Sequence, residues 1–219
     1  PGSALAAIGG ASAGGAPSIA ALLDGAVPGI WAWAQAPTTL AAGYASVRGA
    51  SSFGVTSPKV YVDGIEVANP LLVTRLDPAM VARIEVIRGP QGAALYGADA
   101  ISGVLNVVTR RDGSPTGAPT VTLASRAGAT RSAFLAGSDS LGAAGDVLAQ
   151  THQLTLAAGR GPRTFNVGAT FGTLGAYLPG ATSRSLLVGA SARAVGRRTV
   201  ATGTLRFGDE VTGRTANPL

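Results

Sequence analysis

The run RIEVIRGPQGAALYGADAISGVLNVVT, residues 83–109, carries the clearest strand and helix signals of the chain. Its first six residues alternate between charged and apolar side chains, which predicts a half-buried strand that ends at Gly89-Pro90. A short helix is expected at 92–96, and the β-branched residues of 103–109 predict a second strand. Short strands that alternate with short helices indicate a compact α+β unit.

A hairpin is expected upstream of this run. Residues 59–62, KVYV, predict a strand, and Asp63-Gly64 suits a tight turn with positive φ. Residues 65–67 then form the returning strand. Further along, Asp77-Pro78 marks the start of a short helix, because Asp is a favoured N-cap and Pro a favoured first helical residue.

The beginning of the chain has a different composition. Residues 1–16, PGSALAAIGGASAGGA, are rich in Gly, Ala and Ser, and we interpret them as a flexible lead-in. A helical pattern follows, with Ser18 as N-cap and Ile19, Leu22 and Leu23 on one face. The folded part of the chain is therefore expected to start near residue 17.

The second half of the chain alternates over longer stretches. In 163–172 the apolar residues Phe165, Val167, Ala169 and Phe171 alternate with glycine and small polar residues. Segments of about ten residues with one apolar and one polar face are typical of transmembrane β-strands, whereas the strands of a soluble sandwich are usually shorter. We therefore favour a barrel over a sandwich. Five such segments are expected, near 119–128, 150–158, 163–172, 184–194 and 198–207.

The connections between these segments alternate in length. Those at 159–162 and 195–197 are short, and those at 129–149 and 173–183 are long. Outer-membrane barrels have short periplasmic turns and longer external loops. The alternation therefore also favours the barrel, with its first strand starting on the periplasmic side.

Composition and charge exclude several classes of function. The 219 residues include no Cys and one His, which rules out disulfide frameworks, thiolate metal sites and multi-histidine centres. The first 112 residues carry seven basic and seven acidic residues, and the rest carry ten Arg and four acids, so the net charge of +6 lies in the second half. These arginines are scattered and lack an aromatic platform, which disfavours nucleic acid and leaves an anionic membrane surface as the alternative partner.

Several motifs of the first half occur in a fixed order, and together they resemble the plug domain of TonB-dependent outer-membrane receptors. The resemblance covers residues 17–112, and the alternating segments beyond 119 resemble the opening strands of the family's barrel. The motifs are Leu22-Leu23-Asp24-Gly25-Ala26-Val27-Pro28-Gly29, Val47-Arg48-Gly49, Val60-Tyr61-Val62-Asp63-Gly64, Leu76-Asp77-Pro78, Arg83-Ile84-Glu85-Val86-Ile87-Arg88-Gly89-Pro90, Ala94-Leu95-Tyr96-Gly97 and Ile101-Ser102-Gly103-Val104-Leu105-Asn106-Val107-Val108-Thr109.

The resemblance implies a fold with two parts, an α+β plug domain followed by antiparallel β-strands of an incomplete transmembrane β-barrel. We divide the chain accordingly into a flexible lead-in, a plug domain, a linker and the start of the barrel, which holds about five strands. The boundaries of these four parts are 1–16, 17–112, 113–118 and 119–219.

The resemblance also implies a function. Receptors of this family lie in the outer membrane of Gram-negative bacteria and take up a scarce nutrient, such as a metal–siderophore, cobalamin or an oligosaccharide. The TonB-ExbB-ExbD complex transmits the energy for uptake to the plug. On this resemblance we expect a transport protein in contact with outer-membrane lipid, with no enzymatic activity, cofactor or nucleic-acid partner.

Two arginines are expected to lock the plug in place. In the family, plug arginines at such positions pair with barrel glutamates, which implies this role for Arg48 and Arg88. A buried arginine needs a carboxylate partner, and the four acids of the second half lie in expected loops, so we place the partners on strands outside this chain. The alternative is that Arg88 pairs inside the plug, with Glu85 or Asp77.

The other motif residues of the plug are expected to be structural. Gly89, Gly97 and Gly103 suit tight turns or close backbone approach, and Asp63 and Gly64 suit the hairpin turn. Tyr96 is interpreted as a packing residue with a bonded hydroxyl group. Pro90 ends the strand before it as part of the same motif.

Length marks a departure from the family. A closed barrel of about 22 strands needs over about 200 residues in strands alone, and 107 residues follow residue 112. We therefore expect a fragment or a shortened receptor that does not transport by itself, with no energy-coupling box before the plug. Two alternatives stay open: a surface adhesion module, which Gly, Ala and Ser richness would fit, and a soluble β-rich hydrolase, for which no acid–base pair is evident.

Overall fold

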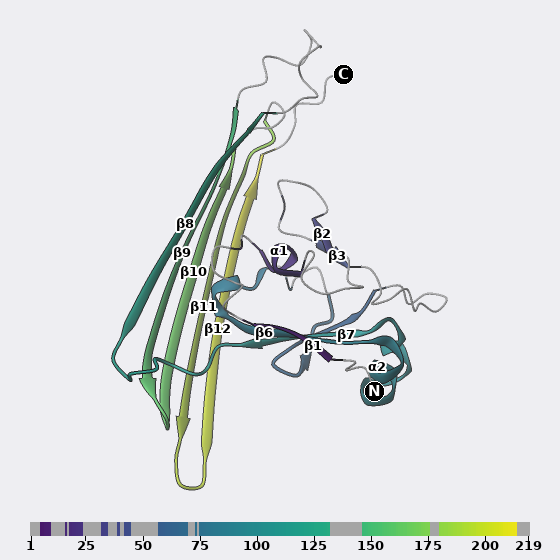
Figure 1. Ribbon diagram of the computed structural model, residues 1–219, viewed down its shortest axis with the longest axis vertical. Coiled ribbons are helices and arrows are strands. Elements are labelled where there is room, and N and C mark those ends of the chain that lie inside the picture. Colours follow the sequence, from purple (N-terminus) through teal and green to yellow (C-terminus); the bar gives the residue numbers. More distant parts are fainter. Residues whose placement is uncertain are drawn as a thin grey trace.

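The structure is a computed structural model that describes residues 5–9, 16, 18–23, 32–34, 39, 42–44, 57–69, 73, 75–131, 146–175 and 180–213. Figure 1 shows two parts: a tall sheet of long strands, and a smaller unit that extends away from one face of it. We call them the tall sheet, which comprises β8 to β12, and the mixed unit, which comprises the described residues up to Thr109. The connecting segment between them is 110–119. No helix in the described part of the chain is long and apolar enough to cross a membrane.

The mixed unit is built on a five-stranded sheet of order β1-β6-β7-β4-β5. The pair β4 and β7 is parallel, and the other neighbours are antiparallel. A second, two-stranded sheet consists of β2 and β3. The strands are β1 Leu5–Gly9, β2 Ala32–Ala34, β3 Ala42–Tyr44, β4 Lys59–Val62, β5 Ile65–Glu66, β6 Val81–Ile87 and β7 Val104–Thr109.

The interpretation of residues 1–16 as a flexible lead-in is wrong for Leu5–Gly9, because these residues form β1. This strand pairs with β6 in register Leu5 to Ile87 and Gly9 to Arg83. Pairing satisfies backbone groups of β6 that would otherwise form an open sheet edge. A Gly and Ala composition concealed this strand, because it signals flexibility but does not prevent extended backbone.

Short helices connect the strands of the mixed unit. Ser18 caps the first of them by accepting a hydrogen bond from the Ala21 amide (3.2 Å), as the sequence predicts. The expected helix at 92–96 begins three residues earlier, because Gly89-Pro90 forms its first turn. The helices are α1 Ile19–Leu23, η4 Pro78–Met80, α2 Gly89–Tyr96 and η5 Ala98–Ser102.

The core of the mixed unit is aliphatic. Residues of β6 and β7 alternate between buried and partly buried, and α1 covers the sheet with Ile19 and Leu23, which are 0% and 1% exposed. Tyr96 packs against Tyr61 with ring centroids 4.9 Å apart. The fully buried large side chains of this core are Ile19, Leu23, Val60, Ile84, Val86, Val104, Leu105 and Val107.

The tall sheet has five antiparallel strands in the order β12-β11-β10-β9-β8. Each strand pairs with the next along the chain, and the short and long connections alternate as predicted. The strands run beyond their expected ends, so Asp209 and Glu210, expected in a loop, lie inside the last strand opposite Leu186 and Ser185. The strands are β8 Thr120–Arg131, β9 Asp146–Arg160, β10 Arg163–Leu174, β11 Ser183–Val195 and β12 Val200–Thr212.

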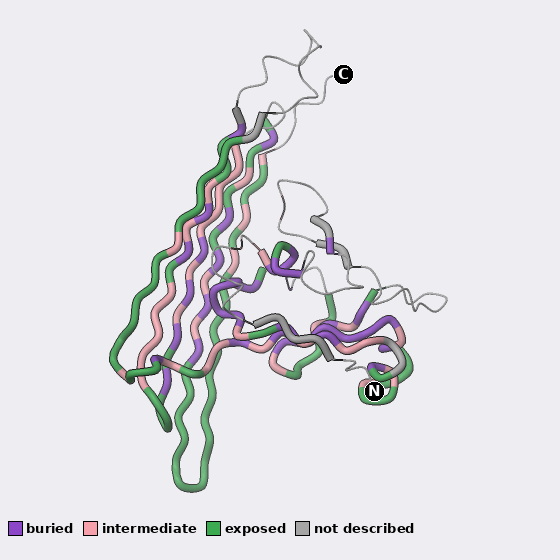
Figure 2. Tube along the Cα trace, viewed as in Figure 1, coloured by how far each residue is buried: buried purple, intermediate pink, exposed green. Residues whose placement is uncertain are grey.

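The two faces of the tall sheet have opposite chemistry. On β10, Thr164, Asn166 and Thr170 are buried, whereas Phe165 is 43% exposed on the other face. Figure 2 shows the buried positions following the middle strands where the mixed unit meets them. We call the polar face the inner face and the apolar one the outer face. Leu187, which interrupts the polar pattern of β11 in the sequence, lies on the inner face and is 1% exposed.

Candidate functional site: the joint between the mixed unit and the tall sheet

The hairpin turn between β4 and β5 supplies the first contact of the joint. Asp63 and Gly64 have φ of 53° and 82°, the conformation of a type I′ turn. Asp tolerates positive φ better than most residues, and Gly is unrestricted. The Gly64 amide donates to the Asn106 side-chain carbonyl on β7 at 3.3 Å. The turn therefore holds the Asp63 carboxylate at the edge of the mixed unit.

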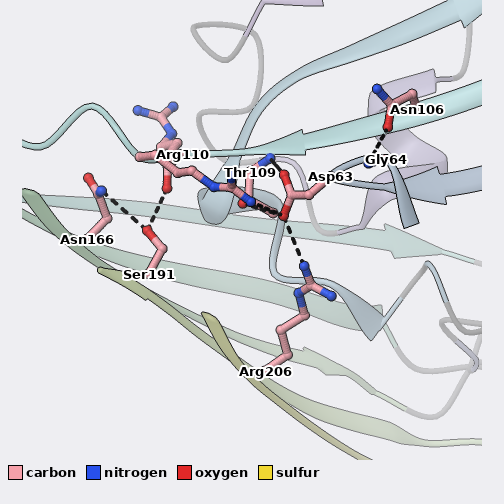
Figure 3. A network of polar contacts seen from close by, with 9 residues as sticks. Asp63, Gly64, Asn106, Thr109, Arg110, Asn166, Ser191 and Arg206 are labelled. Atoms are coloured by element: carbon pink, nitrogen blue, oxygen red, sulfur yellow. Dashed lines mark hydrogen bonds and ion pairs between the residues drawn. The ribbon is translucent and has the colours of Figure 1, made fainter. Parts of the chain in front are cut away.

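The Asp63 carboxylate binds groups from three parts of the chain (Figure 3). The Thr109 amide and hydroxyl donate to it at 2.9 and 2.8 Å. Guanidinium nitrogens of Arg111 and Arg206 lie at 3.1 and 3.2 Å, and the side chain of Asp63 is 7% exposed. Arg206 lies on β12, 143 residues away in sequence, so this ion pair joins the mixed unit to the tall sheet.

Asp77 makes the second contact. It caps η4, and its Oδ1 accepts hydrogen bonds from the Ala79 amide at 2.9 Å and from the Thr170 hydroxyl on β10 at 2.5 Å. Thr170 in turn accepts one from the Gln153 amide at 3.2 Å. The second oxygen, Oδ2, is buried and has no hydrogen-bond partner among the residues that the structure describes. Burial raises the pKa of Asp77 to about 6, against the opposing effect of the bonds from Thr170 and Ala79.

Two glycines of the tall sheet allow η4 to approach closely. A Cβ at Gly168 would lie 2.5 Å from the Asp77 Oδ2 and 2.9 Å from the Met80 Cγ. One at Gly189 would lie 2.6 Å from the same Cγ. A side chain at Gly168 would collide with Asp77, Met80 and Ala79 of the η4 region, whereas one at Gly189 would require the Met80 side chain to shift.

The connecting segment is fixed by its backbone. The Ser191 hydroxyl donates to the Arg110 carbonyl at 2.5 Å, and the Thr164 hydroxyl donates to the Arg111 carbonyl at 2.6 Å. The Asn166 amide donates to Ser191 at 3.4 Å, so the buried hydroxyl has both a donor and an acceptor (Figure 3). The chain therefore leaves the mixed unit along the inner face of β10 and β11.

A cavity of about 400 Å³ lies beside this segment, between η4 and strands β8 to β10. Its lining mixes apolar residues with polar ones, and the polar ones include Arg110, Asp112, Thr122, Thr155 and Asn166. Within the described residues, no group of three His, Asp or Glu could hold a metal ion. The cavity is thus a space of mixed polarity between the two parts of the molecule.

The structure places Arg111 and Arg206 at the joint, and the predicted locking role of Arg48 and Arg88 stays a prediction. Arg48 lies outside the described residues. Arg88 is half-buried and is the N-cap residue of α2, which Figure 1 places at the end of the mixed unit away from the tall sheet. Of the two acids considered as partners of Arg88 within the plug, Glu85 binds Arg83 and Asn106, and Asp77 binds Ala79 and Thr170.

The ion pair across the joint has the opposite polarity from the expected one, because the acid is on the mixed unit and the arginine on the tall sheet. Sequence reasoning assigned Asp63 to a turn and missed its second role. The signal available was the alternation of β12, which places Arg206 on the polar face together with Thr202 and Thr204. The other plug motif glycines, Gly97 and Gly103, have φ of 92° and 101° with extended ψ, a region open only to Gly.

The architecture defines a class of protein: a small α+β domain bound to the polar inner face of an antiparallel sheet whose outer face is apolar. Residues 11–104 match the family model described as the TonB-dependent Receptor Plug Domain. Residues 11–104 thus carry a plug domain of this family, and because they contain most of the mixed unit we call that unit the plug.

Known proteins agree with this assignment. The vitamin B12 transporter BtuB of Vibrio vulnificus (strain CMCP6) is 42% identical over 59 residues, 26% of this chain and 10% of that protein. The RagAB peptide importer in its open-open state has a TM-score of 0.74 at 13% identity over 97% of this chain and 31% of that one. The siderophore receptor PirA from Pseudomonas aeruginosa has a TM-score of 0.61 at 17% identity, and the match covers 96% of this chain and 36% of PirA. The chain thus spans about a tenth of the curated relative and about a third of these structures.

Proposed function

We propose that the chain acts in the energised uptake of a scarce nutrient across the outer membrane of a Gram-negative bacterium. The TonB-ExbB-ExbD complex would pull on the plug, and the substrate would be a metal–siderophore, cobalamin or an oligosaccharide. The relatives named above are transporters and receptors, for vitamin B12 and siderophores among others. No enzymatic step is part of this proposal.

One observation carries the proposal: polar contacts attach the plug to the tall sheet. Asp63 and Asp77 each bind a side chain of the tall sheet, Arg206 and Thr170. Water can replace such partners when the plug moves, so separation costs little net hydrogen-bond energy. An apolar contact of the same size would have no such substitute. The attachment therefore suits a plug that must move and return.

The experiment that tests this function uses the chromosomal gene at its native length. Deletion of the gene should abolish TonB-dependent accumulation of one labelled nutrient from a panel of cobalamin, ferric siderophores and oligosaccharides. Growth under limitation of that nutrient should fall in parallel, and a tonB deletion should give the same defect. Unchanged uptake of every compound in the deletion strain would contradict the proposal.

We also propose that Arg48 and Arg88 lock the plug through carboxylates outside strands β8 to β12. The position of α2 away from the tall sheet supports this for Arg88. Reversal of Arg88 to Glu should loosen the plug, measured as increased sensitivity to a large antibiotic such as vancomycin. A compensating acid-to-Arg change in the barrel should restore resistance, and failure of every candidate acid would reject the pairing.

A further inference from the structure

Four arginines gather at the short turns of the tall sheet. Arg160 and Arg163 flank the turn between β9 and β10, and Arg197 and Arg198 lie in the turn between β11 and β12. All four are exposed. Both turns lie at the same end of the sheet, the lower end in Figure 1. We call these four residues the arginine rim.

The arginine rim borders the apolar outer face. Arg163 and Phe165 are two residues apart on β10, so they share that face about 7 Å from each other. Arg160 is the partner of Arg163 in the β9 to β10 register and therefore lies on the same face. Val167, Ala169 and Phe171 continue the apolar series beyond Phe165. If this series lies in the hydrocarbon of a membrane, the rim lies at the level of the lipid headgroups.

The positive charge of the rim is not compensated within the described part of the chain. Arg160 and Arg163 are directly opposite each other, an arrangement that is unfavourable for like charges. Lys59, Arg83, Arg111 and Arg206, none of which belongs to the rim, form ion pairs with acids in the described part of the chain. A charge cluster of this kind favours an external anion.

The acids of the tall sheet are too far along the strands to help. Asp209 and Glu210 pair with Leu186 and Ser185 near the long-connection end, opposite to the rim. Asp112 of the connecting segment lies beside Thr122 and Thr155 in the cavity lining, whereas Arg160 and Arg163 lie on the outer face. One acid does not balance four arginines.

We propose that the arginine rim binds the phosphate groups of anionic phospholipids in the leaflet that meets the short turns. The proposal rests on the membrane placement that accompanies the proposed function. Guanidinium groups bind phosphate through paired N–H···O bonds, and long arginine side chains can lie along apolar surface with their charge in the polar layer. The bordering apolar face is the reason to favour a lipid over an acidic protein as the partner.

The test compares lipids retained by the purified protein. The native-length gene product is extracted, incubated with an equal mixture of phosphatidylglycerol and phosphatidylethanolamine, and examined by native mass spectrometry. Each basic group near an anionic surface contributes about a fivefold factor, so the wild type should prefer phosphatidylglycerol by roughly tenfold or more. A variant with Arg160→Gln, Arg163→Gln, Arg197→Gln and Arg198→Gln should lose that preference.

Two further variants control for charge and folding. Arg126→Gln with Arg184→Gln removes exposed arginines elsewhere on the tall sheet and should keep the preference. Lysine at all four rim positions keeps the charge without the paired donors and should keep part of it. Equal retention of both lipids by the wild type, or an unchanged preference in the Gln variant, overturns the proposal and would point to a protein partner.

The failure of this proposal can be told apart from that of the proposed function. Flotation with vesicles reports membrane insertion, and nutrient uptake by cells reports transport. If the protein inserts into vesicles and takes up a nutrient but shows no lipid preference, only the proposal of lipid binding by the arginine rim is rejected. A protein that neither inserts nor takes up a nutrient would reject the membrane placement and the rim together.

Discussion

In the mixed unit the large fully buried side chains are aliphatic, whereas on the facing surface of the tall sheet most buried side chains carry hydroxyl or amide groups. The first set includes Ile84 and Val86 at 0% exposure, and the second includes Thr170 and Ser191 at 1% and 2%. When an aliphatic side chain becomes exposed to water, the free energy gained by its burial is lost. A polar group that becomes exposed can replace its protein hydrogen bond with one to water. The mixed unit is therefore held together by buried apolar side chains, whereas its contact with the tall sheet is mainly polar.

The core should be the most sensitive region. Ile84→Ala leaves a cavity among fully buried neighbours and should cost about 2–5 kcal/mol of the free energy of unfolding. Hydrogen exchange of the β6 and β7 amides would report the loss. Ile65→Ala is the matched control, because Ile65 is 74% exposed, and should change protection little. Equal effects of the two substitutions would contradict the assignment of the core.

The Asp77 contact should make docking of the plug depend on pH. Burial raises the pKa of Asp77 from 3.8 to about 6, so the docked state binds the proton more tightly than the undocked state. Docking should be strongest below pH 4 and weaken as the pH rises to about 6, by at most on the order of 3 kcal/mol.

Protease protection of the connecting segment, measured across this pH range, checks the direction. Asp77→Asn has no proton to bind and should remove the pH dependence while keeping an oxygen for the Ala79 amide and Thr170. A wild type that docks more firmly as the pH rises through this range would contradict the interpretation.

The close approach at Gly168 should be sensitive to a single methyl group. Gly168→Ala places a Cβ 2.5 Å from the Asp77 Oδ2 and should weaken docking by about 1–3 kcal/mol through overpacking. Gly203→Ala is the control, because no atom lies within 4 Å of its added Cβ. Disulfide trapping between cysteines placed in η4 and β10 would measure the docked fraction. Loss of docking in both variants would show that the strand backbone, rather than the contact, is affected.

The ion pair of Asp63 should have the smallest effect. Asn tolerates positive φ, so Asp63→Asn keeps the turn and removes the charge. Because Arg111 and Arg206 are 36% and 40% exposed, the loss should be about 0.5–1 kcal/mol and should shrink at high salt. Arg206→Gln should match it. A large, salt-independent loss in Asp63→Asn would mean that the turn itself had changed.

The sequence predicts local structure well where short-range chemistry determines it. Asp63-Gly64, Asp77-Pro78 and the alternation of β10 each depend on neighbours within a few residues, and the structure contains the corresponding turn, cap and two-faced strand. The ends of the strands were underestimated, because an antiparallel ladder continues as long as the neighbouring strand supplies partners.

The joint could not be predicted in the same way. Which group binds the Asp63 carboxylate depends on a strand 143 residues away, and the contact of Asp77 with Thr170 spans 93 residues. The alternation of polar and apolar residues places Arg206 and Thr170 on the inner face. It does not predict at which position along the strands the mixed unit contacts that face. The register between two separately folded parts is a tertiary property with no local signal.

The hydroxyls of Ser191 and Thr164 bind carbonyl groups of residues 110 and 111 rather than their side chains. Every amino acid has the same backbone carbonyl, so substitutions at residues 110 and 111 would leave these two hydrogen bonds intact. Selection would act instead on Thr164 and Ser191 of the tall sheet. A comparison of orthologues should then find that residue 110 varies while Thr164 and Ser191 are conserved. The variable residue would still be bound, because its backbone carbonyl accepts the hydrogen bond.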